Sequence, residues 1–262
     1  MASNTVQRAL LAGTLAAAAV VSLAGCDGST APGELGVNQQ ILASCPDGVR
    51  LNTVVHEDAS GSGSSEEITA QRLSIIETLA RRTAVCGGTF TVSAYSAGSA
   101  ATAPIYSGEL TMPGATDNAR LRRVPDAVDQ VMREITRNWN DALASVPGGG
   151  TDVAGMWRLA AEQQAQAGDG YQLVYVNLTD GLDNLSGQNI AALSPADAAA
   201  AAADMALPEL PGAEVTIAGL GRVNGDPLSS SSVDALVAFY EAACERTGAE
   251  SCLAVTDWRG SR

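Results

Sequence analysis

The feature that most constrains the fold is a regular alternation of short apolar runs and amphipathic stretches between residues 51 and 256. The apolar runs have the length of β-strands, and the stretches between them repeat apolar residues at helical spacing. Strands that alternate with helices are joined by right-handed crossovers and form a mainly parallel sheet with helices on both faces. We therefore predict one α/β domain with a doubly wound sheet over residues 45–262.

The pattern also gives approximate bounds for each element. Strands are predicted at 51–55, 89–95, 171–178, 214–220 and 252–256, with 105–110 as a hairpin partner of the second. Helices are predicted at 65–82, 120–146, 152–167, 194–205 and 232–244. Pro125 should lie in the first turn of the second helix, where its missing N–H is not needed.

The first 25 residues have the layout of a secretory signal, with Arg8 before an Ala/Leu/Val run at 9–23. This run is too short and too rich in small residues for a membrane span. Leu23-Ala24-Gly25-Cys26 resembles a bacterial lipobox, which implies a lipidated Cys26 on an extracytoplasmic protein anchored to the bacterial cell membrane. The alternative is an ordinary signal with an incidental cysteine. Residues 1–25 are thus predicted to be the signal peptide and 26–44 a flexible tether.

Four further cysteines, Cys45, Cys86, Cys244 and Cys252, indicate two disulfides in an exported chain. Four cysteines allow three pairings, and their spacing alone does not choose among them. Cys45 and Cys86 each precede a predicted strand, so parallel neighbours would bring them to one end of the sheet. Cys244 and Cys252 flank the last helix-to-strand turn. We favour these two pairings over a zinc site, because the chain has no Cys-x-x-Cys and a single His.

The charge of the chain argues against polyanionic partners. Its formal net charge is −14, and every basic residue is Arg. Non-specific nucleic-acid binding depends on neutralising phosphates, so nucleic acid is not an expected partner. A polybasic membrane patch is also excluded.

Oxygen-bearing side chains follow several of the predicted strands. Asp58, Ser60 and Ser62 lie in one tight loop after the first strand, Thr151 precedes a helix, and Asp180 follows the strand at 171–178. Carboxylates and hydroxyls are the ligands that hard cations such as Mg²⁺ prefer. Ligands of such sheets also bind outside the carboxyl ends of the strands. Asp58, Ser60, Ser62, Thr151 and Asp180 together form a candidate cation site.

Asp-x-Ser-x-Ser, then a Thr, then an Asp, in this order, resembles the metal-ion-dependent adhesion site of von Willebrand factor A (VWA) domains. The resemblance implies that the strands before Asp58 and Asp180 are neighbours, and that Ser60, Ser62 and Thr151 offer hydroxyls to the cation. Mg²⁺ is the expected cation, and Mn²⁺ or Ca²⁺ are substitutes. An open coordination position would accept a carboxylate from a partner protein.

Each part of the motif also has an ordinary structural interpretation. Ser/Gly loops and Thr-Asp-Gly are common turns, and Thr at a helix start is often a cap. The resemblance favours metal-assisted binding rather than catalysis. A structural or assembly module of the cell envelope, with a cation that only stabilises the fold, is the alternative. An enzyme is not expected, because the sequence contains no recognisable nucleophile and base constellation.

His56 and Glu57 depart from the family pattern, in which the strand is apolar up to the Asp. We expect both side chains at the solvated end of the strand. The alternative is that they shape the rim or tune the metal. Crowding of acids around the site leads to the hypothesis that a bound cation stabilises the fold.

Overall fold

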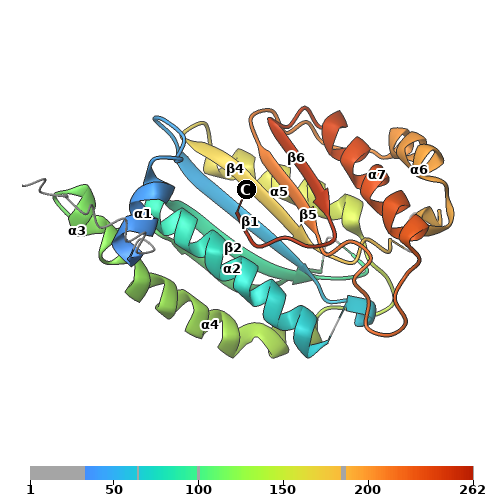
Figure 1. Cartoon of the computed structure of the whole chain (residues 1–262), viewed down its shortest axis with the longest axis horizontal. Helices are drawn as coiled ribbons and strands as arrows, with labels where there is room; N and C mark the ends of the chain where they lie inside the picture. Colours follow the sequence, from blue (N-terminus) through green and yellow to red (C-terminus); the bar gives the residue numbers. More distant parts are fainter. Residues whose placement is uncertain (1–32, 64, 99–100, 184–186, 262) are drawn as a thin grey trace, which may run out of the picture. The chain divides into compact units, whose positions relative to one another are not determined.

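The computed structural model describes residues 33–63, 65–98, 101–183 and 187–261. Its centre is a six-stranded sheet with the order β3-β2-β1-β4-β5-β6 (Figure 1). β3 is antiparallel to β2, and the other neighbouring strands are parallel. The strands are β1 (Arg50–Asp58), β2 (Gly88–Tyr95), β3 (Ala103–Glu109), β4 (Tyr171–Leu178), β5 (Glu214–Ala218) and β6 (Ser251–Val255).

Helices cover both faces of this sheet. α2 and α4 contribute to the hydrophobic core on one face, and α5, α6 and α7 contribute to the core on the other. The α-helices are α1 (Glu34–Leu42), α2 (Glu66–Cys86), α3 (Asp117–Leu121), α4 (Val124–Ser145), α5 (Val153–Ala167), α6 (Pro195–Ala201) and α7 (Ser230–Arg246). Short 3₁₀ turns are η1 (Gly61–Gly63), η2 (Ile190–Ala192) and η3 (Ala202–Asp204). The predicted doubly wound α/β fold is confirmed.

Side-chain alternation explains how the sheet separates the two cores. Leu51 and Val55 of β1 point into the core with α2 and α4, whereas Val54 points into the core with α5 and α7. The helices begin where the sequence offers a cap. The Ser65 hydroxyl accepts a hydrogen bond from the Ile68 amide at 3.2 Å, and Pro125 lies in the first turn of α4 as predicted.

The sheet topology places the switch in strand order between β1 and β4. From β1 the chain proceeds outward to β2 and β3, and then returns to β4 before continuing to β5 and β6. The parallel strands end on the right-hand side of Figure 1. In doubly wound sheets, ligands usually bind in a crevice outside the carboxyl ends of the strands, at the switch in strand order.

The structure differs from the sequence-based prediction at two helices. The predicted helix 120–146 is interrupted near Arg122, so that α3 and α4 are separate. Part of the predicted flexible tether is the helix α1, which packs on the domain. Asn38 of α1 is fully buried, and its Nδ2 donates to the Leu121 carbonyl oxygen at 3.1 Å. The signal peptide, the lipobox and Cys26 lie outside the described residues.

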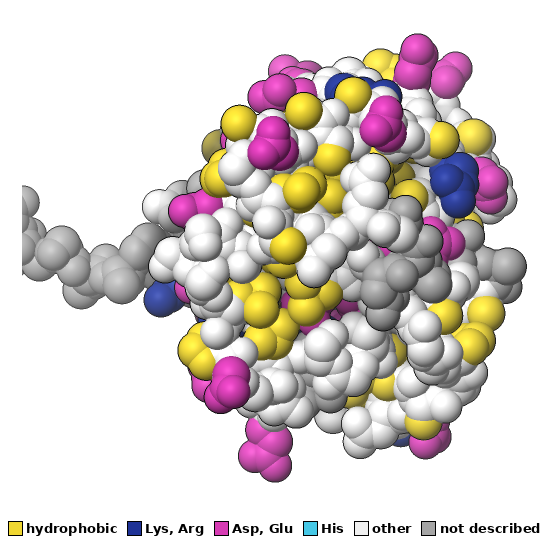
Figure 2. All heavy atoms as spheres, turned by 90° about the vertical axis from the view of Figure 1, so that its right-hand side faces the viewer, with side chains coloured by type: hydrophobic (Ala, Val, Ile, Leu, Met, Phe, Trp, Pro, Cys, Tyr) yellow, Lys and Arg dark blue, Asp and Glu magenta, His cyan; other side chains and the backbone are white. Residues whose placement is uncertain are grey.

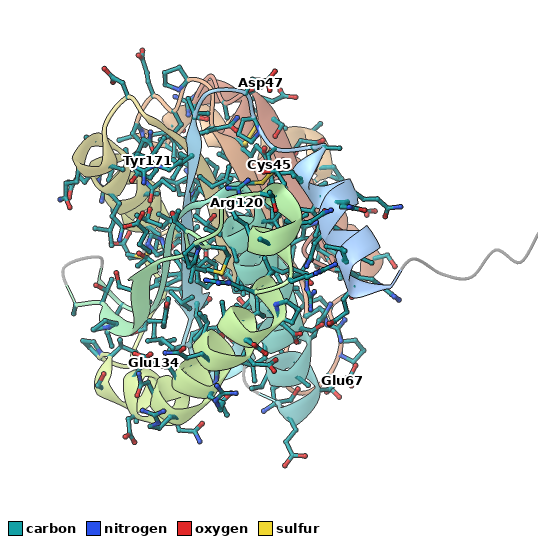
Figure 3. All side chains as sticks on the ribbon, turned by 90° about the vertical axis from the view of Figure 1, so that its left-hand side faces the viewer. Cys45, Asp47, Glu67, Arg120, Glu134 and Tyr171 are labelled. Atoms are coloured by element: carbon teal, nitrogen blue, oxygen red, sulfur yellow. A yellow bond between two sulfur atoms is a disulfide. The ribbon has the colours of Figure 1, made fainter. Side chains whose placement is uncertain are left out.

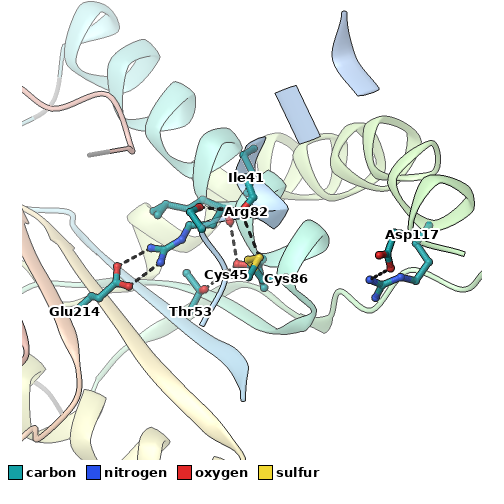
Figure 4. The surroundings of a disulfide bond; sticks show 11 residues. Ile41, Cys45, Thr53, Arg82, Cys86, Asp117 and Glu214 are labelled. Carbon is teal, nitrogen blue, oxygen red and sulfur yellow. Dashed lines mark hydrogen bonds and ion pairs between the residues drawn. A yellow bond between two sulfur atoms is a disulfide. The ribbon is translucent and has the colours of Figure 1, made fainter. Parts of the chain in front are cut away.

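Both predicted disulfides are present. Cys45–Cys86 joins the segment after α1 to the end of α2, and Cys244–Cys252 joins α7 to β6. Figure 3 views the molecule from the side where the parallel strands begin, and Cys45 and Tyr171 lie on this side. Near the first disulfide, Arg82 of α2 donates two hydrogen bonds to Glu214 of β5, at 2.6 and 2.7 Å (Figure 4). Two disulfides fit an oxidising, extracytoplasmic compartment.

In the part of the chain that the structure describes, none of the helices has the length and apolar character needed to cross a membrane.

Candidate metal site

Two buried carboxylates meet at the strand-order switch. Asp58 is the last residue of β1, and Asp180 comes two residues after the end of β4. These strands are paired in parallel, with Glu57 opposite Leu178. The side chains are 1% and 0% exposed, respectively. The adjacency that the VWA resemblance implies for these strands is therefore confirmed.

Hydrogen bonds hold the Asp58 carboxylate on both oxygens. Oδ1 accepts from the Ser60 amide at 2.8 Å, and Oδ2 accepts from the Thr179 hydroxyl at 2.6 Å. The same Thr179 oxygen accepts from the Gly181 amide at 3.0 Å. Thr179 thus fixes Asp58 from the neighbouring strand, a role that the sequence analysis missed. In the sequence, the sign of this role is the position of Thr179 directly before Asp180. In the register of β1 and β4, this position is opposite Asp58.

The Asp180 carboxylate is only partly satisfied. Oδ1 accepts from the Leu182 amide at 2.9 Å, whereas Oδ2 is buried without a hydrogen-bond partner among the described residues. Burial and the charge of Asp58 raise the pKa of Asp180, and the nearby Ser62 hydroxyl, the Leu182 amide and Arg72 oppose this shift. A buried carboxylate oxygen without a donor costs free energy, and a cation would satisfy it.

A tight turn after Asp180 fixes its position. Gly181 has a φ of 81°, in the left-handed region that favours glycine. A Cβ at this residue would lie 2.6 Å from Leu220 Cδ2 and 2.9 Å from Tyr240 Cε2. The glycine in Thr-Asp-Gly is thus required by both conformation and packing.

Three hydroxyl-bearing residues of the candidate site line one cavity. The Ser60 and Ser62 hydroxyl oxygens lie 3.2 Å apart in the loop that follows β1. Thr151 lines the same cavity, whose volume is about 780 Å³. Its loop is tied to the end of β2, because the Asp152 amide donates to the Ser96 carbonyl oxygen at 2.8 Å. Asp152 also caps α5 by accepting from the Gly155 amide at 2.8 Å.

Apolar and small residues form much of the remaining cavity wall. Among the described lining residues, the only charged side chain is Asp183, and there is no Arg. Figure 2 shows acidic side chains at the bottom of a hollow between hydrophobic ones, with the Arg side chains visible in this view lying outside it. The apolar part of the wall consists of Ala59, Val146, Pro147, Leu182, Ile190, Ala191 and Leu236.

The predicted placement of His56 and Glu57 at a solvated strand end is wrong. Both are buried, because β1 continues through Asp58 and the sheet is covered on both faces here. Arg72 of α2 forms an ion pair with Glu57 and donates to the Asp58 carbonyl oxygen at 3.0 Å. Burial raises the pKa of Glu57 to about 7, although Arg72 opposes the shift.

His56 lies on the opposite face of the sheet from Glu57. Its ring centroid is 5.4 Å from that of Tyr175 and 6.3 Å from that of Tyr95, both edge-on. Burial lowers the pKa of His56 to about 4, which keeps it neutral at physiological pH. This residue belongs to the core beneath α5 rather than to the cavity wall.

Arg72 is the second residue that the sequence analysis missed. It lies on the stripe of α2 that also carries the buried residues Ile68, Ile75 and Leu79. A lone Arg at helical spacing among core residues indicates a buried counter-charge.

The chemistry of the site fits a hard cation with mixed ligands. The structure places Asp58 and Asp180 at the ends of neighbouring strands, close enough for the charge of Asp58 to act on Asp180. It places Ser60, Ser62 and Thr151 around one cavity, which neither carboxylate lines. No cluster of three or more His, Cys, Asp or Glu side chains suited to a metal occurs within the described ranges. Two carboxylates and three hydroxyls are hard oxygen ligands, which suit Mg²⁺, Mn²⁺ or Ca²⁺.

Sequence comparisons do not place the chain in a family. No family model matches it, and neither does any curated protein. Among solved structures it is similar to proximal thread matrix protein 1 from the mussel byssus, with 16% identity, 79% of this chain and 43% of that chain covered, and a TM-score of 0.36. It is also similar to manganese-loaded Plasmodium vivax TRAP protein, with 13% identity, 72% and 62% coverage, and a TM-score of 0.36.

The chain spans less than two thirds of the length of either of these structures, covering 43% and 62% of them. At such identities and scores the two likenesses carry no functional argument. The doubly wound α/β fold, of the kind that a VWA-like domain has, rests on the sheet topology of this chain itself.

Proposed function

We propose that the chain is a binding module that captures an acidic group of a partner protein through a divalent cation. The observation that carries this proposal is the pair of buried carboxylates, Asp58 and Asp180, next to a cavity whose lining includes Ser60, Ser62 and Thr151. Two adjacent buried anions repel each other, and one Asp180 oxygen has no donor in the described structure. A bound cation would relieve both costs.

The proposed ligands are Asp58, Ser60, Ser62, Thr151 and Asp180, acting directly or through water. Mg²⁺ suits this set because it prefers oxygen ligands and usually retains water, and Mn²⁺ or Ca²⁺ could replace it. When bound, the cation would supply a positive centre that attracts a carboxylate. Uncharged hydroxyl ligands leave more of that positive charge available to the partner.

The cavity wall supports a protein partner rather than a polyanion. Apolar side chains such as Leu182 and Leu236 can contact the residues that flank an acidic side chain. Because no Arg lines the described wall, a nucleic acid or another polyanion would find no second positive group. In this proposal, lipidation of Cys26 holds the module on the outer side of the cell membrane.

We infer binding rather than catalysis for this site. Three side chains near the site are candidates for a general base. Glu57 pairs with Arg72, and His56 lies in the core with a lowered pKa, and neither lines the cavity. Asp183 does line the cavity, but it forms no recognisable constellation with a nucleophile. The second candidate function, a structural module of the cell envelope, would use another surface and need the cation only for stability.

Capture of partners from the native cell envelope tests the proposal. The wild-type chain should retain a partner in Mg²⁺ and release it in EDTA, and Ser60→Ala or Asp180→Ala should retain none. Ser229→Ala, at the exposed cap of α7, is a matched control. Retention of the same partner by the Asp180→Ala variant in EDTA would favour the structural module instead.

A further inference from the structure

Glu57 and Arg72 form a buried ion pair directly behind the candidate cation site. Glu57 is 1% exposed and Arg72 is 6% exposed. Their side chains are in contact on the face of β1 that α2 covers. A small cavity beside Arg72 is lined by apolar residues such as Ile75 and Leu178, together with Gln71 and Arg222.

Stability alone does not explain this pair. Removing two charges from water carries a large desolvation cost, and well-packed apolar residues of similar volume often stabilise a fold equally well. The position before Asp58 lies in a central strand, where apolar residues are the rule. The pair must therefore be judged by what it does for its neighbours.

Arg72 contacts the cation site through the main chain. Its Nη1 donates both to Glu57 Oε1 and to the carbonyl oxygen of Asp58, the latter at 3.0 Å. This bond fixes the peptide at the point where β1 turns into the loop with Ser60 and Ser62. However, a guanidinium so close to Asp58 and Asp180 also repels any cation that they bind.

We propose that Glu57 is the charge-compensating residue of the cation site and that Arg72 is its positioning residue. Arg72 holds the Asp58 main chain, and Glu57 neutralises the guanidinium so that Asp58 and Asp180 keep their net negative charge for the cation. This inference rests on the proposed function, because it assigns a role to two residues that would not touch the metal themselves.

A charge-compensating role for Glu57 and a packing role predict different Mn²⁺ affinities for the same variants. Glu57→Gln keeps the shape but leaves the guanidinium uncompensated, so Mn²⁺ should bind about ten- to a hundredfold more weakly. Glu57→Gln/Arg72→Gln removes both charges but also the bond from Arg72 to the Asp58 carbonyl oxygen, so its Mn²⁺ affinity should recover part of the loss and lie between that of Glu57→Gln and that of wild type. If the pair only packs, the double variant loses more contacts than the single one and should bind more weakly still.

The experiment is calorimetric titration of Mn²⁺ alone into the full chain at about pH 8, where a paired glutamate is ionised. A cooperative thermal transition identifies the variants that are folded. Arg72→Lys keeps the positive charge but changes the shape of the group that carries it, and serves as the conservative variant. Its Mn²⁺ affinity should be closer to wild type than that of Glu57→Gln. Arg72→Lys can be compared with Glu57→Gln even if the double variant fails to fold.

Two results would overturn the inference while leaving the proposed function intact. One is a Glu57→Gln variant that binds Mn²⁺ as tightly as wild type. The other is a double variant that binds no better than the single one. A wild-type chain that takes up no Mn²⁺ would instead overturn the proposed function, and this inference with it.

Discussion

At the scale of single residues, the position of Asp58 depends on a donor from the neighbouring strand. The Thr179 hydroxyl donates to Asp58 Oδ2 at 2.6 Å, and Thr179 is fully buried. Thr179→Val keeps the shape and removes this donor, so the free energy of unfolding should fall by about 1.5–3 kcal/mol, the usual range for a hydrogen bond to a charged group. Denaturant unfolding measures the loss. Thr179→Ser retains the hydroxyl and is the control. A Val variant as stable as the Ser variant would contradict this role.

His56 should make the fold sensitive to acid. Its pKa is lowered to about 4 by burial, whereas in the unfolded chain it has the ordinary value of about 6.5. As the pH falls from about 6.5 to 4, the unfolded state takes up a proton that the folded state does not, so stability is lost across this window. Between pH 7 and pH 4.5 the loss due to His56 should be about 2 kcal/mol.

Unfolding in denaturant and EDTA at these two pH values measures the effect without a cation. His56→Phe places an apolar ring between Tyr95 and Tyr175, and this variant should lose about 2 kcal/mol less than wild type on acidification. Equal losses in the two proteins would show that His56 does not govern the acid response.

At the scale of elements, the sequence predicts the order of strands and helices well and their ends less well. Strand 171–178 has the predicted bounds, because Gly170 precedes it and Thr179-Asp180-Gly181 ends it with a turn. β1 is longer than predicted at both ends. The sequence predicts a solvated Glu57, because its partner Arg72 is 15 residues away on another element. Local patterns do not reveal a counter-charge that only tertiary packing brings close.

The same limit applies to the candidate site and to α1. The five proposed ligands could be read from the motif, whereas Thr179 and Arg72 act through contacts across elements. Segment 34–42 resembles a polar spacer in composition, yet it is helical and its Asn38 is buried against α3. Composition indicates whether a segment can fold by itself. It does not indicate whether contacts with a neighbouring element will hold the segment in a helix.

The two disulfides should differ in their contribution to stability. Cys45–Cys86 closes a loop with a sequence separation of 41, and Cys244–Cys252 one with a separation of 8. Loop-closure entropy predicts losses of about 4 and about 2.5 kcal/mol, respectively, when each pair is replaced by Ser. Thermal or denaturant unfolding of Cys45→Ser/Cys86→Ser and Cys244→Ser/Cys252→Ser compares them. A larger loss for the second pair would indicate that packing between α7 and β6 outweighs the entropy of the unfolded chain.

At the scale of the whole molecule, negative charge is spread over the chain and is also concentrated at the candidate cation site. The chain has a formal net charge of −14, and Asp58 and Asp180 concentrate part of it in a buried position. Any salt reduces the general repulsion between surface charges by screening. Only a cation that binds the folded site stabilises it further through mass action. These two effects can be separated by comparing salts of equal ionic strength.

Thermal unfolding in MgCl₂, and in NaCl of matched ionic strength with EDTA, should therefore give different transition temperatures. At a Mg²⁺ concentration about 100 times the dissociation constant, linkage contributes about 2.7 kcal/mol, which raises the Tm of a domain of this size by about 5–10 °C. Asp180→Asn should remove this response and raise the Tm in EDTA, because it removes one of two adjacent buried charges. Asp197→Asn changes the net charge equally at an exposed position in α6, and should keep the full Mg²⁺ response. Superimposable curves for wild type in the two salts would refute the cation site, whereas an equal Mg²⁺ response in both variants would place the binding elsewhere.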